Sequence, residues 1–323
     1  MNDLESDQST NNRQTMKCFI DAVGQKIKHL ILSNADDRSN ISSLTESEVA
    51  ILEQIIDRMC VRCVNNSPVR REVVTPIRHI NQVDTWDCGL ACIQMVINWL
   101  NNNCNATQEV QEEQRRWMMD FVKAKSLWTI DLITLLQNML DLNSNNNSTY
   151  LFCSNRFGID ESYNNLHYYK DAFSKDEIRV KRLFDKAEQQ NLPLLQVSHM
   201  SFNVLIDLVS RENVVAIVLL DNTIFNQQNN TSNAKTASNI HDQSDLSYSG
   251  HYVVLCGVSR DKNDINIATM NSQTDDSETY SYCLVIKNPG IWKETQFVTP
   301  SLFEASWRAK GTDEDIILVA KHV

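Results

Sequence analysis

The sequence predicts an α+β protein, with helices in its first half and an antiparallel sheet in its second half. Before residue 142, apolar residues recur mostly at helical spacing. After it, short continuous apolar runs alternate with polar, turn-rich stretches. Because successive apolar runs lie close together along the chain, we expect their strands to pair as antiparallel neighbours.

Composition and charge narrow the classes of function. The chain has 323 residues, of which 42% are hydrophobic, enough for a sizeable core. Its net charge of −11 argues against nucleic acid or an anionic membrane surface as the main partner. The N-terminus lacks the apolar core of a signal peptide, and the longest apolar run, residues 214–220, is far too short to span a membrane. Nine cysteines without framework spacing favour a soluble protein of a reducing, intracellular compartment, cytoplasmic or nuclear.

The N-terminal part of the chain is predicted to be separate from the main domain. Residues 1–14 are polar and are predicted to be disordered, and residues 15–72 form a helical segment. Within it, apolar periodicity predicts helices over 16–32 and 45–60. A CxxC pair, Cys60 and Cys63, ends the second helix. Since neither a second CxxC nor a spaced histidine pair accompanies it, we interpret it as structural rather than as a zinc or redox site.

Residues 73–320 are predicted to form one domain that two polar insertions interrupt. The insertions, 222–249 and 260–279, are rich in polar residues and are predicted to be disordered. An extended lead-in is expected over 70–80, where Pro76 excludes a regular helix. Periodicity predicts helices over 88–100, 109–122, 127–142, 176–190, 201–210 and 301–308. Strands are predicted at 150–153, 194–197, 214–220, 250–258, 280–286 and 315–320.

The stretch from His79 to Leu100 carries the strongest functional signal. Gln82 is followed six residues later by Cys88, and an apolar helix starts there. A cysteine at a helix start faces unpaired backbone N–H groups and the positive end of the dipole, which favour the thiolate. Cys88 is therefore a candidate nucleophile, although a helix-start cysteine is often only a buried packing residue.

Two later residues could complete a cysteine site. A cysteine nucleophile needs a base within hydrogen-bond reach and a group that orients the base. His251 precedes a buried strand, and Asn288 follows the next one in a Pro-Gly turn. If those strands pair, the Asn288 amide can accept the imidazole N–H and fix its tautomer. Gln82 could then donate to an oxyanion near the Cys88 backbone N–H.

Other side chains near these motifs could have either functional or purely structural roles. Cys92 lies one helical turn after Cys88 and could resolve an oxidised Cys88, but core packing is the simpler interpretation. Trp86 could line a substrate cleft or only wedge the loop. The acidic run of Asp313, Glu314 and Asp315 could bind a cation, but it is predicted to be a solvated turn before the last strand.

Five sequence stretches together resemble known families. They are HINQVDTWDCGLAC at 79–92, LWTIDL at 127–132, SGHYVVLCG at 249–257, the NPG turn at 288–290 and GTDEDI at 311–316. Their order resembles the papain-like cysteine peptidase superfamily, especially its bacteriocin-processing, C39 peptidase-like branch. The chain resembles the guanylyl cyclase domain-containing protein 1 family more closely still.

The resemblance implies a papain-like fold and assigns roles to four residues. It implies a helical part that carries the cysteine and an antiparallel β-sheet part that carries its partners. Cys88, His251 and Asn288 take the triad positions, and Gln82 takes the oxyanion position. Asn288 departs from the Asp that is usual in the C39-like branch, although Asn is the papain-type choice.

Three functions remain open from the sequence. A thiol hydrolase would act on a peptide or small acyl substrate and would need no cofactor. The family name implies a guanylyl cyclase that converts GTP to cyclic GMP with Mg or Mn. For that chemistry the sequence offers neither a Walker-type loop nor paired aspartates in a strand-turn context, and only a loose cyclase-centre pattern at 281–285. The third is a catalytically silent adaptor that keeps the fold to bind protein partners.

Overall fold

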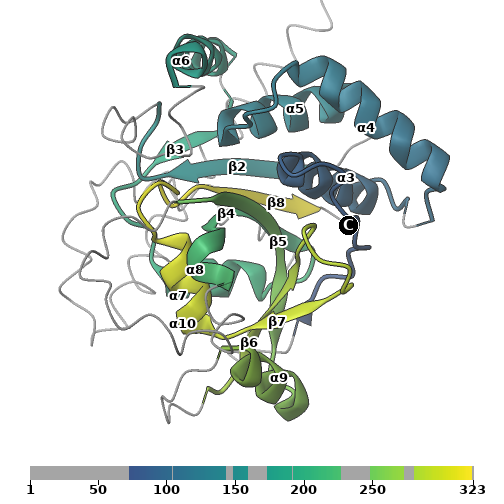
Figure 1. The fold of residues 1–323 in the computed structure, drawn as a ribbon, viewed down its shortest axis with the longest axis vertical. Coiled ribbons are helices and arrows are strands. Elements are labelled where there is room, and N and C mark those ends of the chain that lie inside the picture. Colours follow the sequence, from purple (N-terminus) through teal and green to yellow (C-terminus); the bar gives the residue numbers. More distant parts are fainter. Residues whose placement is uncertain are drawn as a thin grey trace, which may run out of the picture.

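The computed structural model shows an α+β fold in which one eight-stranded mixed sheet carries helices on both faces (Figure 1). The structure describes residues 73–103, 105–142, 148–158, 173–190, 192–226, 248–272 and 280–321, and eight helices lie within these ranges. The helices predicted over 16–32 and 45–60, and the Cys60–Cys63 pair, lie outside the described residues.

The sheet runs in the order β3-β2-β8-β4-β5-β6-β7, and β1 pairs with β5 beside this path. The strands are β1 (Val73–Val74), β2 (Ser148–Ser154), β3 (Leu194–Gln196), β4 (Val214–Asp221), β5 (Gly250–Ser259), β6 (Cys283–Lys287), β7 (Gln296–Val298) and β8 (Ile316–Lys321). Short β7 is absent from the sequence-based prediction.

The expectation of an antiparallel sheet needs one correction. Every described strand pair is antiparallel except β2 with β3, which is parallel. Parallel neighbours require a long crossover connection, and the chain between β2 and β3 contains the helix α6 (Phe173–Gln189). The sheet is therefore mixed.

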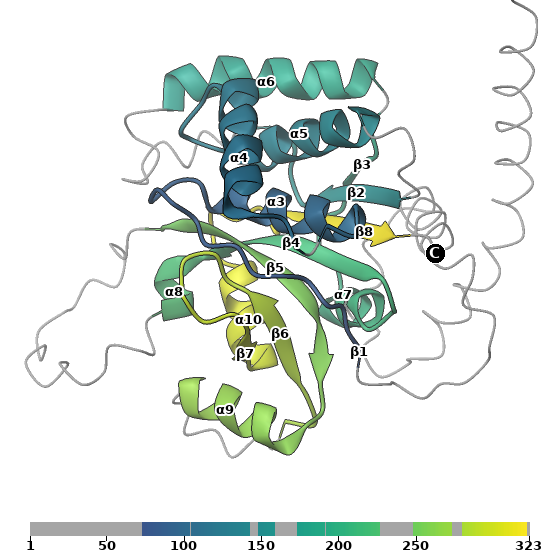
Figure 2. The same cartoon turned by 90° about the vertical axis from the view of Figure 1, so that its right-hand side faces the viewer.

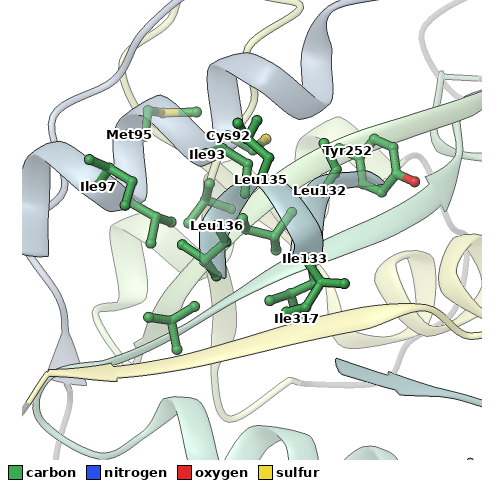
Figure 3. Close-up of a cluster of buried hydrophobic side chains, with 14 of the residues drawn as sticks. Cys92, Ile93, Met95, Ile97, Leu132, Ile133, Leu135, Leu136, Tyr252 and Ile317 are labelled. Atoms are coloured by element: carbon green, nitrogen blue, oxygen red, sulfur yellow. The ribbon is translucent and has the colours of Figure 1, made fainter. Parts of the chain in front are cut away.

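Helices α3 (Cys88–Leu100), α4 (Gln108–Val122) and α5 (Thr129–Leu142) lie with α6 on one face of the sheet (Figure 2). All thirteen residues of α3 are buried, because the helix packs on β5 and is covered by α4 and α5. Apolar side chains of α3 and α5 meet those of the sheet in a continuous core (Figure 3). This core holds the first turn of α3 in place.

Helices α7 (Phe202–Val209), α8 (Asn222–Asn226) and α10 (Pro300–Trp307) lie on the opposite face (Figures 1 and 2). There a second core forms around the fully buried Phe303 and Trp307. Alternate residues of β5 serve the two cores: Val253 packs in the second and Val254 in the first. Both cores therefore depend on the same strands.

The first predicted insertion, 222–249, begins with helix rather than with disorder. Asp221 accepts a hydrogen bond from the N–H of Thr223 at 2.8 Å and so caps α8. Phe225 is buried against the second core, which anchors this short helix. Residues 227–247 of the insertion lie outside the described residues.

The second predicted insertion, 260–279, contains helix α9 (Lys262–Ser272). Asp261 accepts the N–H of Asn263 at 2.7 Å at the helix start. Ala268 is buried on the side where α9 packs against β6 and β7. The prediction of disorder was therefore wrong for this part of the insertion.

None of the helices in the described ranges is both long enough and apolar enough to cross a bilayer.

Candidate active site

Cys88 is the first residue of α3, and the loop before it is held by a buried carboxylate. Asp87 accepts the backbone N–H groups of Val83, at 3.2 Å, and Asp84, at 2.9 Å. Arg115 of α4 donates to Asp87 at 2.7 Å and to Asp84 at 2.6 Å. These bonds fold the loop into one conformation and fix where Cys88 enters the helix.

The Cys88 thiol has a raised pKa, contrary to the expectation of a thiolate. Cys88 is only 6% exposed to solvent. Burial raises the pKa from 9.0 to about 11, although the backbone N–H groups of Tyr252 and Gly89 lower it and the Asp87 charge raises it further. Burial therefore outweighs the helix start, and Cys88 is a neutral thiol at neutral pH.

His251 and Asn288 lie in direct contact, as the sequence predicts. Strands β5 and β6 pair antiparallel with Val254 opposite Lys287. Continued past the end of β6, this register places His251 beside the turn that follows Asn288. The His251 Nε2 and the Asn288 Oδ1 are 2.8 Å apart, and both residues are buried.

Two further bonds fix the Asn288 amide and, through it, the imidazole tautomer. Oδ1 also accepts the backbone N–H of Gly290 at 2.9 Å, and Nδ2 donates to the Gln296 Oε1 at 3.0 Å. Because a backbone N–H can only donate, the amide oxygen is the atom that faces His251. The imidazole must then carry its hydrogen on Nε2, which leaves Nδ1 as the free base. Burial lowers the pKa of His251 below 6.5, so the ring is neutral.

Gly290 is a site residue that the sequence analysis does not single out. A Cβ at this position would lie 3.2 Å from the His251 Cε1 and 3.3 Å from the Asn288 Oδ1. The absence of a side chain therefore lets the turn close over the His251–Asn288 pair. Gln296 was missed as well, because it lies on the unpredicted strand β7.

Backbone contacts bring the cysteine loop to this pair. The Tyr252 N–H, one residue after His251, lies within hydrogen-bond reach of the Cys88 sulfur. His79 Nε2 donates to the Asn288 carbonyl at 2.8 Å, and the Gln82 N–H donates to the Pro289 carbonyl at 2.9 Å. Segments from three distant parts of the chain thus meet at one place.

The Gln82 side chain is only partly engaged. Its Nε2 donates one hydrogen to the Asp84 carbonyl at 2.8 Å, and the other hydrogen is not used in that bond. Its Oε1 is out of contact with solvent and has no hydrogen-bond partner among the described residues. The amide thus keeps one donor for a further acceptor.

A pocket opens beside Cys88. Its walls include Trp86, Thr129, Tyr252, Asp313 and Asp315, so Trp86 lines a cleft. Cys92, by contrast, is fully buried in the core beneath Cys88. The predicted solvated turn is wrong for the acidic run, because Glu314 and the carboxyl group of Asp315 are buried.

The described part of the chain contains no group of three or more His, Cys, Asp or Glu side chains that could hold a metal ion. The pocket contributes two carboxylates, those of Asp313 and Asp315. Burial raises the pKa of Asp315 to about 8, so this group is mostly protonated at neutral pH. Two carboxylates without a third metal-ligating side chain among the described residues do not fit a paired-metal site.

Comparison with known proteins places this chain in a family. The family model described as guanylylate cyclase matches residues 77–319, a range that contains all four predicted site residues. The chain belongs to this guanylylate cyclase family. It is also similar to Guanylyl cyclase 1 of Arabidopsis thaliana, with 26% identity over 243 residues, which is 75% of each chain. No solved structure matches.

Proposed function

We propose that this member of the guanylylate cyclase family is a thiol hydrolase with a papain-like Cys-His-Asn site, acting on an amide or acyl substrate. The observation that carries the proposal is the contact of His251 with Asn288, which puts the imidazole hydrogen on Nε2 and leaves Nδ1 as the base, while the N–H of the next residue, Tyr252, reaches the Cys88 sulfur. A papain-like fold agrees with the division of the site, because a helix carries the cysteine, strand β5 carries His251, and the turn after the neighbouring strand β6 carries Asn288.

The protonation states favour general-base attack over a preformed ion pair. Cys88 has a raised pKa and His251 a lowered one, so both are neutral at rest. His251 Nδ1 takes the thiol proton as the sulfur–carbon bond forms, and the imidazolium then gives that proton to the leaving amine or alcohol. Water, deprotonated by the same nitrogen, hydrolyses the acyl-enzyme and restores the thiol. These reaction steps need no cofactor.

Asn288 and Gln82 support these steps without exchanging protons. Asn288 Oδ1 accepts the Nε2–H throughout and stabilises the imidazolium. The oxyanion would accept hydrogen bonds from the Cys88 backbone N–H, at the start of α3, and from the remaining N–H of the Gln82 amide.

A peptidyl acyloxymethyl ketone probe tests the proposal on the full chain. We expect labelling of wild-type protein, none in Cys88→Ser, and a loss of about 100-fold or more in His251→Ala, because the general base is gone. His199→Ala is the matched control, since the His199 side chain is 72% exposed and lies outside the pair. Equal labelling of wild type and His251→Ala would sink the proposal.

The family description and the name of the Arabidopsis relative favour a second candidate, conversion of GTP to cyclic GMP. The carboxylates of the pocket do not fit a paired-metal site, so no cyclase step is derived for them. The test incubates purified protein with GTP and Mg or Mn and measures cyclic GMP. Cyclic GMP formed equally by wild type and Cys88→Ala would support the cyclase at a separate site. Silence in both assays would favour the protein-binding adaptor.

A further inference from the structure

Asp315 is held rigidly in the wall of the Cys88 pocket. Its backbone N–H donates to the Thr312 carbonyl at 3.0 Å, and its carbonyl accepts the Leu219 N–H at 3.1 Å. Its carboxyl group is buried, although the residue as a whole is partly exposed. The two backbone bonds therefore fix the position of the Asp315 main chain in the pocket wall.

One oxygen of this carboxyl group accepts a hydrogen bond from the protein. Thr129 Oγ1 donates to Asp315 Oδ2 in a short hydrogen bond. The Thr129 oxygen also contacts the Tyr252 hydroxyl at 2.9 Å. A hydroxyl has one hydrogen, so when Thr129 donates to an ionised Asp315, Tyr252 must donate to Thr129. The chain from Tyr252 to Oδ2 is then complete.

The other oxygen, Asp315 Oδ1, is out of contact with solvent and has no hydrogen-bond partner among the described residues. The Ser154 hydroxyl lies close enough to lower the Asp315 pKa. Its single hydrogen, however, is directed to the carbonyls of Arg156, at 2.6 Å, and Asp313, at 3.2 Å. A buried acceptor without a donor costs free energy that a ligand can recover.

We propose that Asp315 is a specificity residue that binds an amine or guanidinium group of the substrate, so that the Cys88 site prefers basic acyl substrates. This inference rests on the thiol-hydrolase function proposed above. When Asp315 is ionised, a donor on Oδ1 satisfies every group of the Tyr252–Thr129–Asp315 chain. A cationic donor fits better than a neutral one, because it pairs with the ionised carboxylate and because Asp313 adds a second negative charge to the same pocket.

Binding of a cation should be coupled to release of a proton. The Asp315 pKa is raised to about 8, mainly by burial and next by the charge of Asp313. A bound cation favours the ionised form, so affinity for it increases as pH rises towards that value. The other titratable groups around Asp315 are Cys88, Lys125, Cys153, Tyr248, Tyr252 and Asp313. Of these, Lys125 is exposed, so its flexible ammonium group can leave the pocket to the ligand.

The experiment compares two dipeptidyl acyloxymethyl ketone probes that differ only in lysine against norleucine beside the reactive carbonyl. In the full-length wild type we expect the lysine probe to label Cys88 at least roughly tenfold faster, as befits a charge-assisted hydrogen bond. Asp315→Asn has the same shape but can present an N–H in place of the unpaired oxygen. We expect it to reduce the preference to within about twofold, because the lysine probe slows far more than the norleucine probe.

Asp207→Asn is the matched control. Asp207 is exposed on α7, on the opposite face of the sheet, so its loss changes the net charge equally but should leave the preference intact. An equal slowing of both probes in Asp315→Asn would assign that residue a structural or general catalytic role and overturn the specificity inference.

Wild-type protein alone supplies a second readout in case Asp315→Asn does not fold. The lysine-to-norleucine rate ratio should rise with pH up to about 8, since effects of Cys88 and His251 cancel in the ratio. His251-dependent labelling without any lysine preference would refute the inference alone. Absence of His251-dependent labelling with both probes would refute the proposed function and the inference with it.

Discussion

The Asn288 amide orients His251, and two other hydrogen bonds hold that amide in place. The Gly290 N–H and the Gln296 side chain determine which end of the amide faces the imidazole. The pair is therefore preorganised before any substrate binds.

The His251 environment predicts the acid limb of the activity profile. His251 must be neutral to act as a base, and burial lowers its pKa below 6.5, so probe labelling should persist below that pH. Asn288→Asp places a carboxylate against the ring, which favours the imidazolium and should move the acid limb to higher pH. The measurement is the labelling rate against pH for both proteins.

Gln296→Ala is the control for this shift, because it loosens the Asn288 amide without adding charge. We expect a slower rate with an unmoved limb. A wild-type limb at or above 6.5 would contradict the buried, neutral histidine.

At this scale the sequence predicts which residues meet but not their protonation. Cys88 is recognisable from the helix that follows it, and His251 and Asn288 from the strands that they flank. The raised pKa of Cys88 depends on burial by packing partners that are distant in sequence, so local pattern suggests a thiolate instead. The prediction for Asp315 was wrong for the same reason, since its acidic neighbours resemble a solvated turn.

The loop between β1 and α3 depends on one arginine of α4, Arg115, which forms ion pairs with Asp84 and Asp87. Arg115→Met would leave the 1%-exposed Asp87 without its cation, although two backbone N–H groups still bind that carboxylate. We expect a loss of about 2–3 kcal/mol in the free energy of unfolding, measured by urea titration. The less neutralised Asp87 should also slow alkylation of Cys88 at pH 8, because its charge raises the thiol pKa.

The double variant Arg115→Met with Asp87→Asn provides the control. The amide oxygen that replaces the Asp87 carboxylate can still accept the loop N–H groups but carries no charge to compensate. We expect about half or more of the lost stability to return, whereas no recovery would mean that Arg115 acts through packing rather than charge.

Gly257 marks a bulge where β5 pairs with both β1 and β6. The register shifts between Leu255 and Gly257, whose φ is +144°, and a Cβ there would lie 2.0 Å from the Val73 carbonyl oxygen. Gly257→Ala should therefore cost about 3 kcal/mol or more. Thermal and urea unfolding measure the loss.

Gly158→Ala is the matched control, since Gly158 also has a positive φ, +97°, but a Cβ added there would meet no atom within 4 Å. It should cost only about 1 kcal/mol. Similar losses for the two variants would show that backbone strain, and not contact with β1, dominates at Gly257.

Helices are predicted correctly where apolar residues recur over many positions, and they are missed where a short helix is held by one or two local contacts. The thirteen-residue α3 and the fourteen-residue α5 carry enough apolar positions to be found from the sequence. Helices α8 and α9 sit in polar surroundings, and each is anchored mainly by one aspartate cap and one buried side chain. Those signals were present in the sequence at Asp221 and Asp261, but composition outweighed them. Strand β7 has three residues, too few for a pattern.

The two cores share one sheet, so the described domain should unfold as a unit. Leu132→Ala removes a fully buried side chain from the first core, and Phe303→Ala removes one from the second. We expect losses of about 2–5 and 3–5 kcal/mol, each shifting the same calorimetric transition. A transition that splits in either variant would show that the two layers unfold independently.

Topology is the least predictable level. The antiparallel neighbours β5 and β6 are close in the chain and could be paired from the sequence. The central position of β8, between β2 and β4, joins segments more than 90 residues apart and has no local signature. The parallel pairing of β2 with β3 likewise follows from the crossover and not from the strands themselves.

The buried Cys88 thiol has a practical consequence for proteome-wide surveys of reactive cysteines. Such surveys rank cysteines by their rate with small electrophiles such as iodoacetamide, and a pKa of about 11 places Cys88 near the bottom of that ranking. Reagents that first occupy the adjoining pocket would position the electrophile at the sulfur. Cys88 would then react slowly with unselective reagents and would be labelled only by reagents whose shape fits the pocket.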